Sequence, residues 1–166
     1  MTWLPRFAFL LLLVSVSSQA EVEKYGGFIP KFGCFGGPFS LRLTNDYEAL
    51  RSLGTLRSER VLDVRDWDTY KTETRELVFD GLRIEVITFT NDKSKAMLET
   101  VEITSRHWDI AREVQVGDSI DAVTRGFGVK EWKSDGEITF NGETDYVKFS
   151  TKQGRIIKIR FECYTG

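Results

Sequence analysis

The sequence reads ETRELVFDGLRIEVITF from Glu73 to Phe89. Hydrophobic and polar residues alternate on both sides of Asp80-Gly81, a dipeptide that is favoured in the tight turn of a β-hairpin. The pattern predicts two antiparallel strands, at residues 73–79 and 82–89, each with one buried face and one face in water. The sheet of this protein is therefore expected to be antiparallel.

The same alternation recurs before and after this hairpin. It predicts strands at residues 60–67, 97–105, 137–140, 145–151 and 155–164. Three of these strands are predicted to present the following residues together on one face: Leu62 and Val64; Met97, Val101 and Ile103; and Ile157, Ile159, Phe161 and Cys163.

Two short helices are predicted, one before each group of strands. The first is expected between about residues 45 and 54, because Thr44 or Asn45 can cap it and Gly54 can end it. The second is expected between about residues 119 and 128, because Asp118 or Ser119 can cap it. Its hydrophobic stripe consists of Ile120, Val123 and Phe127. Gly126 and Gly128 are expected to end it.

The order of these elements predicts the fold class. A helix followed by strands, twice, is typical of an α+β domain. We expect residues 44–166 to form a tandem repeat of a short helix followed by an antiparallel sheet, in two similar halves, 44–106 and 107–166. One face of the sheet is expected to be open to solvent, because the alternation leaves one polar face on each strand.

The segment before this domain has an unusual composition. Residues 25–39 contain five glycines, two prolines and five aromatic residues. Gly and Pro argue against a regular element, whereas so many aromatics argue against a free tail. We expect residues 21–43 to form an extended arm whose Phe rings are buried on the domain, with a partner-binding loop as the alternative.

The first 20 residues predict export. Arg6 precedes the apolar run 7–14, and small residues follow up to Ala20, as in a secretory signal peptide. The run is too short to span a bilayer. No cysteine stands at the expected cleavage point, so a soluble periplasmic or secreted protein without a membrane anchor is predicted. The formal net charge of −2 gives no indication of nucleic-acid binding.

The two cysteines, Cys34 and Cys163, lie near opposite ends of the mature chain. In an oxidising compartment such a pair predicts a disulfide. A metal or redox site is disfavoured, because the chain has one histidine and no Cys-x-x-Cys. No cofactor motif is present in the sequence.

The segment VGDSIDAVTRGFG, residues 116–128, resembles the helix of the SmpA/OmlA and beta-lactamase-inhibitor-protein-like group of exported bacterial domains. The later segments 146–149 and 154–159 resemble the paired strands of that group. The resemblance implies a fold like that of the inhibitor protein. It also implies a role in binding other proteins, since the group includes inhibitors and assembly scaffolds.

The open face of the predicted sheet carries the candidate binding residues. An aromatic residue or arginine among charges of both signs is typical of protein-binding hot spots. An ordinary solvated sheet face is the alternative. The candidate residues are Trp67, Arg83, Glu85, Tyr146, Lys148, Lys158 and Arg160, together with Glu102.

Catalytic signatures are weak in this sequence. His107 has no nucleophile motif near it, and the acidic groups Asp63, Asp66 and Asp68 or Glu99 and Glu102 are unremarkable among 25 acidic residues. We therefore expect a non-enzymatic protein-binding module, an inhibitor or immunity protein for an enzyme of the envelope. An envelope-assembly scaffold and a carboxylate-dependent hydrolase are the alternatives.

Overall fold

The structure is a computed structural model that describes residues 23–128 and 135–164. The predicted signal peptide, residues 1–20, lies outside the described residues. The elements in chain order are β1 (Glu23–Phe28), α1 (Tyr47–Arg51), β2 (Ser58–Trp67), β3 (Tyr70–Phe79), β4 (Leu82–Phe89), β5 (Asp92–Ile103), α2 (Ile120–Gly126), β6 (Gly136–Asn141), β7 (Tyr146–Lys152) and β8 (Arg155–Glu162).

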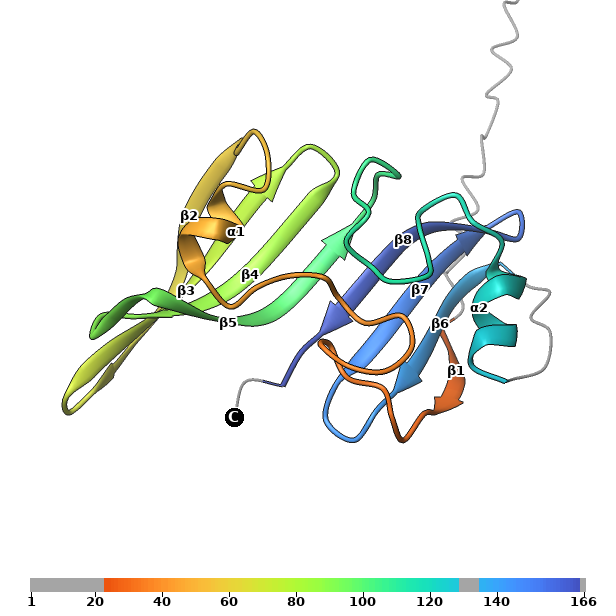
Figure 1. Ribbon diagram of the computed structural model, residues 1–166, viewed down its shortest axis with the longest axis horizontal. Coiled ribbons are helices and arrows are strands. Elements are labelled where there is room, and N and C mark those ends of the chain that lie inside the picture. The colour runs from red at the N-terminus through yellow and green to blue at the C-terminus, as the bar shows by residue number, and fades with distance from the viewer. Residues whose placement is uncertain (1–22, 129–134, 165–166) are drawn as a thin grey trace, which may run out of the picture.

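The described strands form one mixed sheet in the order β1-β6-β7-β8-β5-β4-β3-β2 (Figure 1). The α+β tandem repeat predicted from the sequence is wrong. The structure is 53% strand and 9% helix, and it is a largely β fold with a single eight-stranded sheet in its described part. The pairing of β5 with β8 joins the two predicted groups of strands in one continuous sheet.

One face of this sheet carries the hydrophobic core. Side chains such as Ile84, Val101, Phe149 and Phe161 are fully buried there. The cover consists of α1, α2, the arm and the segment 104–119, which lie over this side of the sheet (Figure 1). Because this cover is on one side, no layer formed by residues 23–128 and 135–164 lies over the opposite sheet face.

The predicted hairpin at Asp80-Gly81 is present, with Phe79 paired to Leu82 and Gly81 at a positive φ of 75°. Both predicted helices are also present, although they have only five and seven residues. Asp46 caps α1, because its side chain accepts a hydrogen bond from the Ala49 N–H, and Ser119 caps α2. Neither is long enough to cross a bilayer, and no other helix occurs in the residues that the structure describes.

Three β-bulges make the predicted faces wrong in β2, β5 and β8. The extra residues are Leu62 in β2, Glu99 in β5 and Ile157 in β8. Each inserts one residue into a strand, and this reverses the inside-outside alternation beyond it. Leu98 therefore faces the core, although the predicted alternation places Met97 on the same face as Val101.

The buried residues also differ from the prediction in β8, because of its bulge, and in β2, because of its place at the edge of the sheet. In β8 it is Ile156 that is buried, while Ile157 is 43% exposed. In β2 the pair Leu62 and Val64 is not buried, because β2 is the edge strand and both side chains stand in solvent.

The arm differs from the prediction in two ways. Its start is a regular strand, since β1 pairs in parallel with β6. Phe32 and Phe39 are buried as expected, but Phe28 and Phe35 are exposed. Gly26 explains how β1 can approach, because a Cβ at this position would lie 2.7 Å from a ring atom of Phe140.

The predicted disulfide between Cys34 and Cys163 is confirmed, with Cα atoms 5.7 Å apart. It joins the arm to the end of β8. Asp145 strengthens the same junction, because its carboxylate accepts hydrogen bonds from the Cys34 N–H at 2.6 Å and from the Tyr164 N–H at 2.7 Å. The arm is therefore held covalently and by charge-assisted hydrogen bonds.

Candidate functional site

We call the uncovered side of the sheet the open face. The strand register places on it every binding residue predicted from the sequence, because register partners in a sheet point to the same side. Its side chains, from β6 to β2, include Glu137, Thr139, Tyr146, Lys148, Lys158, Arg160, Glu162, Glu99, Glu102, Arg83, Glu85, Ile87, Met97, Glu76, Tyr70 and Trp67.

Charges of opposite sign alternate across the middle of the open face. Arg160 lies between Glu162, at 2.5 Å, and Glu102, at 3.9 Å. Lys158 lies between Glu102, at 3.9 Å, and Glu137, at 3.8 Å. Each side chain is thus restrained by neighbours on adjoining strands, which keeps this surface ordered before any partner binds.

Glu137 anchors one end of this series. Burial alone would raise its pKa, but a hydrogen bond from the Ser150 hydroxyl and the ammonium groups of Lys148 and Lys158 outweigh burial. The pKa of Glu137 therefore lies below its usual range. It stays ionised, and so it holds both lysines in place.

Glu76 anchors the other end. Its side chain is only 4% exposed, yet it forms ion pairs with Arg60 at 2.6 Å and Arg83 at 3.4 Å. The two arginines reach this carboxylate from neighbouring strands. Arg83, predicted as a binding residue, is thus partly engaged in holding the sheet surface together.

Glu85 and Glu99 lie between these two anchors and form no hydrogen bond or ion pair with the residues that the structure describes. Burial, followed by the charge of Glu85, raises the pKa of Glu99. The charge of Glu85 is balanced at longer range by Arg160 and Arg60, and that of Glu99 by Arg65. The centre of the open face therefore holds two carboxylates that form no ion pair with the described residues.

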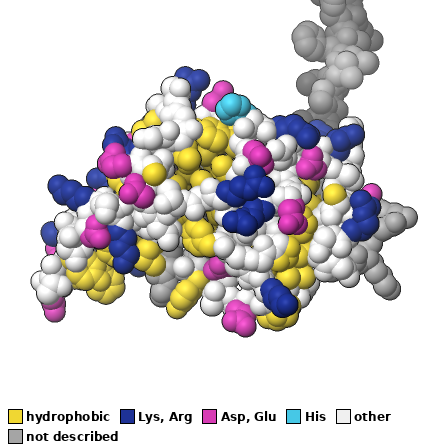
Figure 2. All heavy atoms as spheres, viewed as in Figure 1, with side chains coloured by type: hydrophobic (Ala, Val, Ile, Leu, Met, Phe, Trp, Pro, Cys, Tyr) yellow, Lys and Arg dark blue, Asp and Glu magenta, His cyan; other side chains and the backbone are white. Residues whose placement is uncertain are grey.

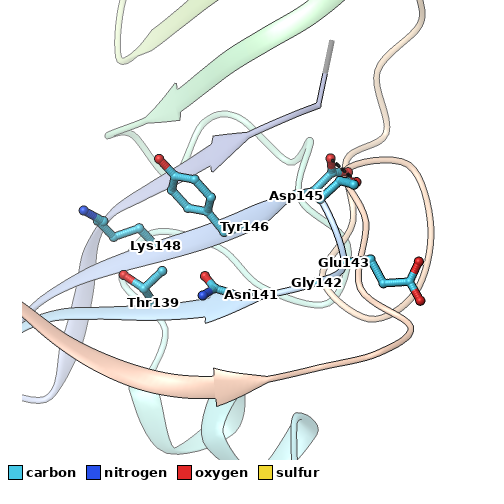
Figure 3. Close-up of a pocket in the computed structure, with 8 residues that line it drawn as sticks. Thr139, Asn141, Gly142, Glu143, Asp145, Tyr146 and Lys148 are labelled. Atoms are coloured by element: carbon cyan, nitrogen blue, oxygen red, sulfur yellow. Dashed lines mark hydrogen bonds between the residues drawn. The ribbon is translucent and has the colours of Figure 1, made fainter. Parts of the chain in front are cut away.

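A polar hollow of about 370 Å³ lies at the β6–β7 end of the open face (Figure 3). Tyr146 and Lys148 project from β7 beside Thr139 and Asn141 of β6, and the turn with Asp145 closes one side. The Thr139 hydroxyl oxygen is buried and has no hydrogen-bond partner in the part of the chain that the structure describes. Hydroxyl, amide and ammonium groups make this hollow suitable for a polar group.

An apolar hollow of about 290 Å³ lies at the β2–β5 end of the open face. Trp67 stacks on Tyr70, with ring centroids 6.2 Å apart, and Tyr70 contacts Phe89 at 6.2 Å. The Trp67 indole N–H donates to the Thr72 hydroxyl at 3.2 Å, which fixes the ring. Trp67 nevertheless remains 49% exposed.

The two hollows lie at opposite ends of the open face. Five strand spacings of about 4.8 Å place β2 and β7 on the order of 24 Å apart. The structure thus brings Lys148, Lys158 and Arg160 into one group and leaves Trp67 apart from them. The alternation in residues 136–141 could have identified Glu137, whereas the Glu99 bulge hid both Glu99 and Met97.

The candidate catalytic residues are not assembled into a reactive group. His107 lies on the rim of a pocket of about 320 Å³ that also contains Ser105 and Asp80. The Ser105 hydroxyl accepts a hydrogen bond from the backbone N–H of His107, not from its ring. Asp63 and Asp66 pair with Arg65 and Lys71 at the edge of the sheet. In residues 23–128 and 135–164, no group of acidic, His or Cys side chains could hold a metal ion.

A third group of charges lies on the covered side, beside α1. Tyr47 donates a hydrogen bond to Glu59 at 2.5 Å, and Arg75 pairs with the same carboxylate at 2.6 Å. Burial, followed by this hydrogen bond, raises the pKa of Tyr47 to about 12. The phenol stays protonated at physiological pH, and its hydrogen bond to Glu59 of β2 helps to fix α1 to the sheet.

Figure 2, which has the same view as Figure 1, shows the covered side of the sheet, where both signs of charge are mixed with polar and hydrophobic atoms. Comparison with known proteins does not narrow the site further. No protein-family model matches the chain, and neither do the curated proteins or the solved structures searched with it. The resemblance of residues 116–128 to the SmpA/OmlA group therefore stays a prediction.

Proposed function

We propose that this protein is an exported, non-enzymatic module that binds another protein through the open face. The observation that carries the proposal is a continuous sheet face over which the described part of the chain forms no layer. This face has a restrained charge network in its middle and a hollow with an aromatic residue at each end. Tyr, Trp and Arg are enriched at protein interfaces, and binding requires less ordering where side chains are already fixed.

The size of the open face suits this role. Eight strands at about 4.8 Å spacing, with about six residues of each strand at about 3.3 Å, give a surface on the order of 700 Å². A standard protein interface buries about 800 Å² on each partner. The open face alone is therefore close to the area that a stable complex needs.

The proposed mode of action is steric. A preordered surface that covers the working site of an envelope or secreted enzyme would act as an inhibitor or immunity protein. The confirmed disulfide and the predicted signal peptide support export, because disulfides persist in oxidising compartments. A scaffold for envelope assembly would use the same surface, but it would remain with the outer membrane on fractionation.

Affinity capture from an envelope extract, followed by identification of the partner, tests the proposal. Trp67→Ala and Tyr146→Ala should each weaken a purified one-to-one complex by at least about 2 kcal/mol, or roughly thirtyfold in Kd, if they are hot spots. Phe35→Ala is the matched control, since Phe35 is an exposed aromatic of the arm. If both open-face variants bind as the wild type does, the proposed surface is wrong.

A further inference from the structure

The apolar hollow at the β2–β5 end has the dimensions of a receptor for a single side chain. Its volume of about 290 Å³ lies at the lower limit of small-molecule pockets, which start near 300 Å³. Ile87, Met97 and Phe89 form its apolar part, and Trp67 with Tyr70 forms an aromatic wall. Arg65, Thr72 and Thr74 complete the lining. Such a lining gains free energy when an aliphatic or aromatic group displaces water from it.

The two unpaired carboxylates of the open face border this hollow. Glu85 is two residues from Ile87 in β4, and Glu99 is two residues from Met97 in β5, on the same side of the sheet. Two residues of a strand span about 6.6 Å, so both carboxylates lie within one side-chain length of the apolar lining. Hydrophobic contact and negative charge therefore meet at one place.

The basic residues closest to the hollow are already engaged. Arg65 forms an ion pair with Asp63 at 3.0 Å, and the Lys95 ammonium lies 5.3 Å from the centroid of the Phe89 ring. Neither forms an ion pair with Glu85 or Glu99, although the charge of Arg65 partly offsets the rise in the pKa of Glu99. A partly buried carboxylate without a partner is costly, and a cation brought by a binding partner would remove that cost.

We infer that this hollow and the two carboxylates together receive an apolar side chain that lies next to a lysine or arginine on the protein partner. The inference rests on the proposed function and specifies the chemistry of the partner at one end of the open face. The raised pKa of Glu99 is consistent with it, because burial and the charge of Glu85 are its main causes and a nearby ammonium would lower that pKa.

A titration of the mature wild-type protein with small probes, followed by NMR at about pH 7, tests this inference without any partner. The probes are 3-phenylpropylammonium, 3-phenylpropanol and 3-phenylpropionate, which share one apolar group and differ in charge. The ammonium should shift the Ile87 and Met97 methyl signals and the Trp67 indole signal. Its Kd, expected in the millimolar range, should be at least about fivefold lower than that of the alcohol.

Charge-neutral variants identify the source of this preference. In the double variant Glu85→Gln, Glu99→Gln, the ammonium and the alcohol should bind about equally, with the Kd of the alcohol unchanged. Asp109→Asn is the matched control, since Asp109 is an exposed carboxylate of the covered side that pairs with Arg42. The control should keep the full preference for the ammonium.

Two outcomes would overturn the inference. One is a carboxylate or alcohol probe that binds as tightly as the ammonium, and the other is no shift of the Trp67, Ile87 and Met97 signals with any probe. Either result leaves the proposed function to its own test, because a partner could still bind the open face through Tyr146 and the charge network. A complex that forms without the ammonium preference would contradict the inference alone.

Discussion

Glu99 is a residue of the open face whose ionised side chain lowers the stability of the fold. Its pKa is raised, so the folded protein keeps this proton at pH values where the unfolded chain has lost it. The stability from this difference is present below the unfolded pKa of about 4.3 and is lost as pH rises through the folded pKa. Near neutral pH the ionised Glu99 therefore disfavours folding.

Glu99→Gln is accordingly expected to stabilise the protein near neutral pH. The change removes the charge and keeps the shape, and the gain should be a few tenths of a kcal/mol, because the side chain is only partly buried. Urea denaturation at about pH 7 and at about pH 3.5 measures it, and the difference from wild type should disappear at the lower pH.

Glu102→Gln is the matched control for this prediction. Glu102 is a neighbour of Glu99 on the same strand, but it forms ion pairs with Lys158 and Arg160. Its neutralisation should therefore leave the stability unchanged or lower it by up to about 1 kcal/mol. If Glu99→Gln lowers the stability at neutral pH to the same extent, Glu99 is not an unpaired charge.

The position of single residues could be predicted only where the alternation is unbroken. Arg83 and Glu85 follow directly from the hairpin turn at Asp80-Gly81, which fixes their face. Met97 and Ile157 could not be placed, because the bulges at Glu99 and at Ile157 itself leave no unambiguous mark in a sequence of alternating residues. The apolar hollow was missed for this reason.

At the level of elements, β1 is the strand that sequence patterns exclude. Its two glycines argue against a strand when propensity alone is considered. The structure gives the physical reason for one of them, because β1 passes so close to the buried side chains of Ile138 and Phe140 that no Cβ fits at Gly26. The glycine is required by the close approach and does not mark a break.

Gly26→Val is therefore expected to displace β1 from the edge of the sheet. The added side chain would clash with Phe140 and Ile138, which are fully buried, and an overpacked core site costs roughly 1 to 3 kcal/mol. Hydrogen exchange of the β1 and β6 amides measures the effect, and these amides should lose protection while those of β3 and β4 keep it.

Gly36→Ala provides the control for this prediction. A Cβ at Gly36 has no atom within 4 Å, so this change should alter stability by no more than about 0.5 kcal/mol. Uniform loss of protection throughout the sheet in Gly26→Val would contradict the prediction, since it would mean that β1 supports the whole fold.

At the level of the whole molecule, core and cover are confined to one side of a single sheet. The arm, both short helices and the segment 104–119 all lie over that side, and the disulfide fixes the arm there. The proposed binding surface is the other side. This separation predicts that the covalent link supports the fold but takes no direct part in binding.

The double variant Cys34→Ser, Cys163→Ser tests that separation. The disulfide closes a loop with a sequence separation of 129 residues. Its loss should lower the free energy of unfolding by up to about 4 to 5 kcal/mol, because the unfolded chain gains conformational freedom. Urea denaturation measures the loss, and wild type treated with a reducing agent should show the same decrease.

Under conditions where circular dichroism shows a folded variant, the Kd for the captured partner should stay within about twofold of the wild-type value, since open-face contacts lie on the opposite side of the sheet from the arm. A tenfold weaker complex from a folded variant would mean instead that the arm, with its exposed Phe28 and Phe35, belongs to the binding surface.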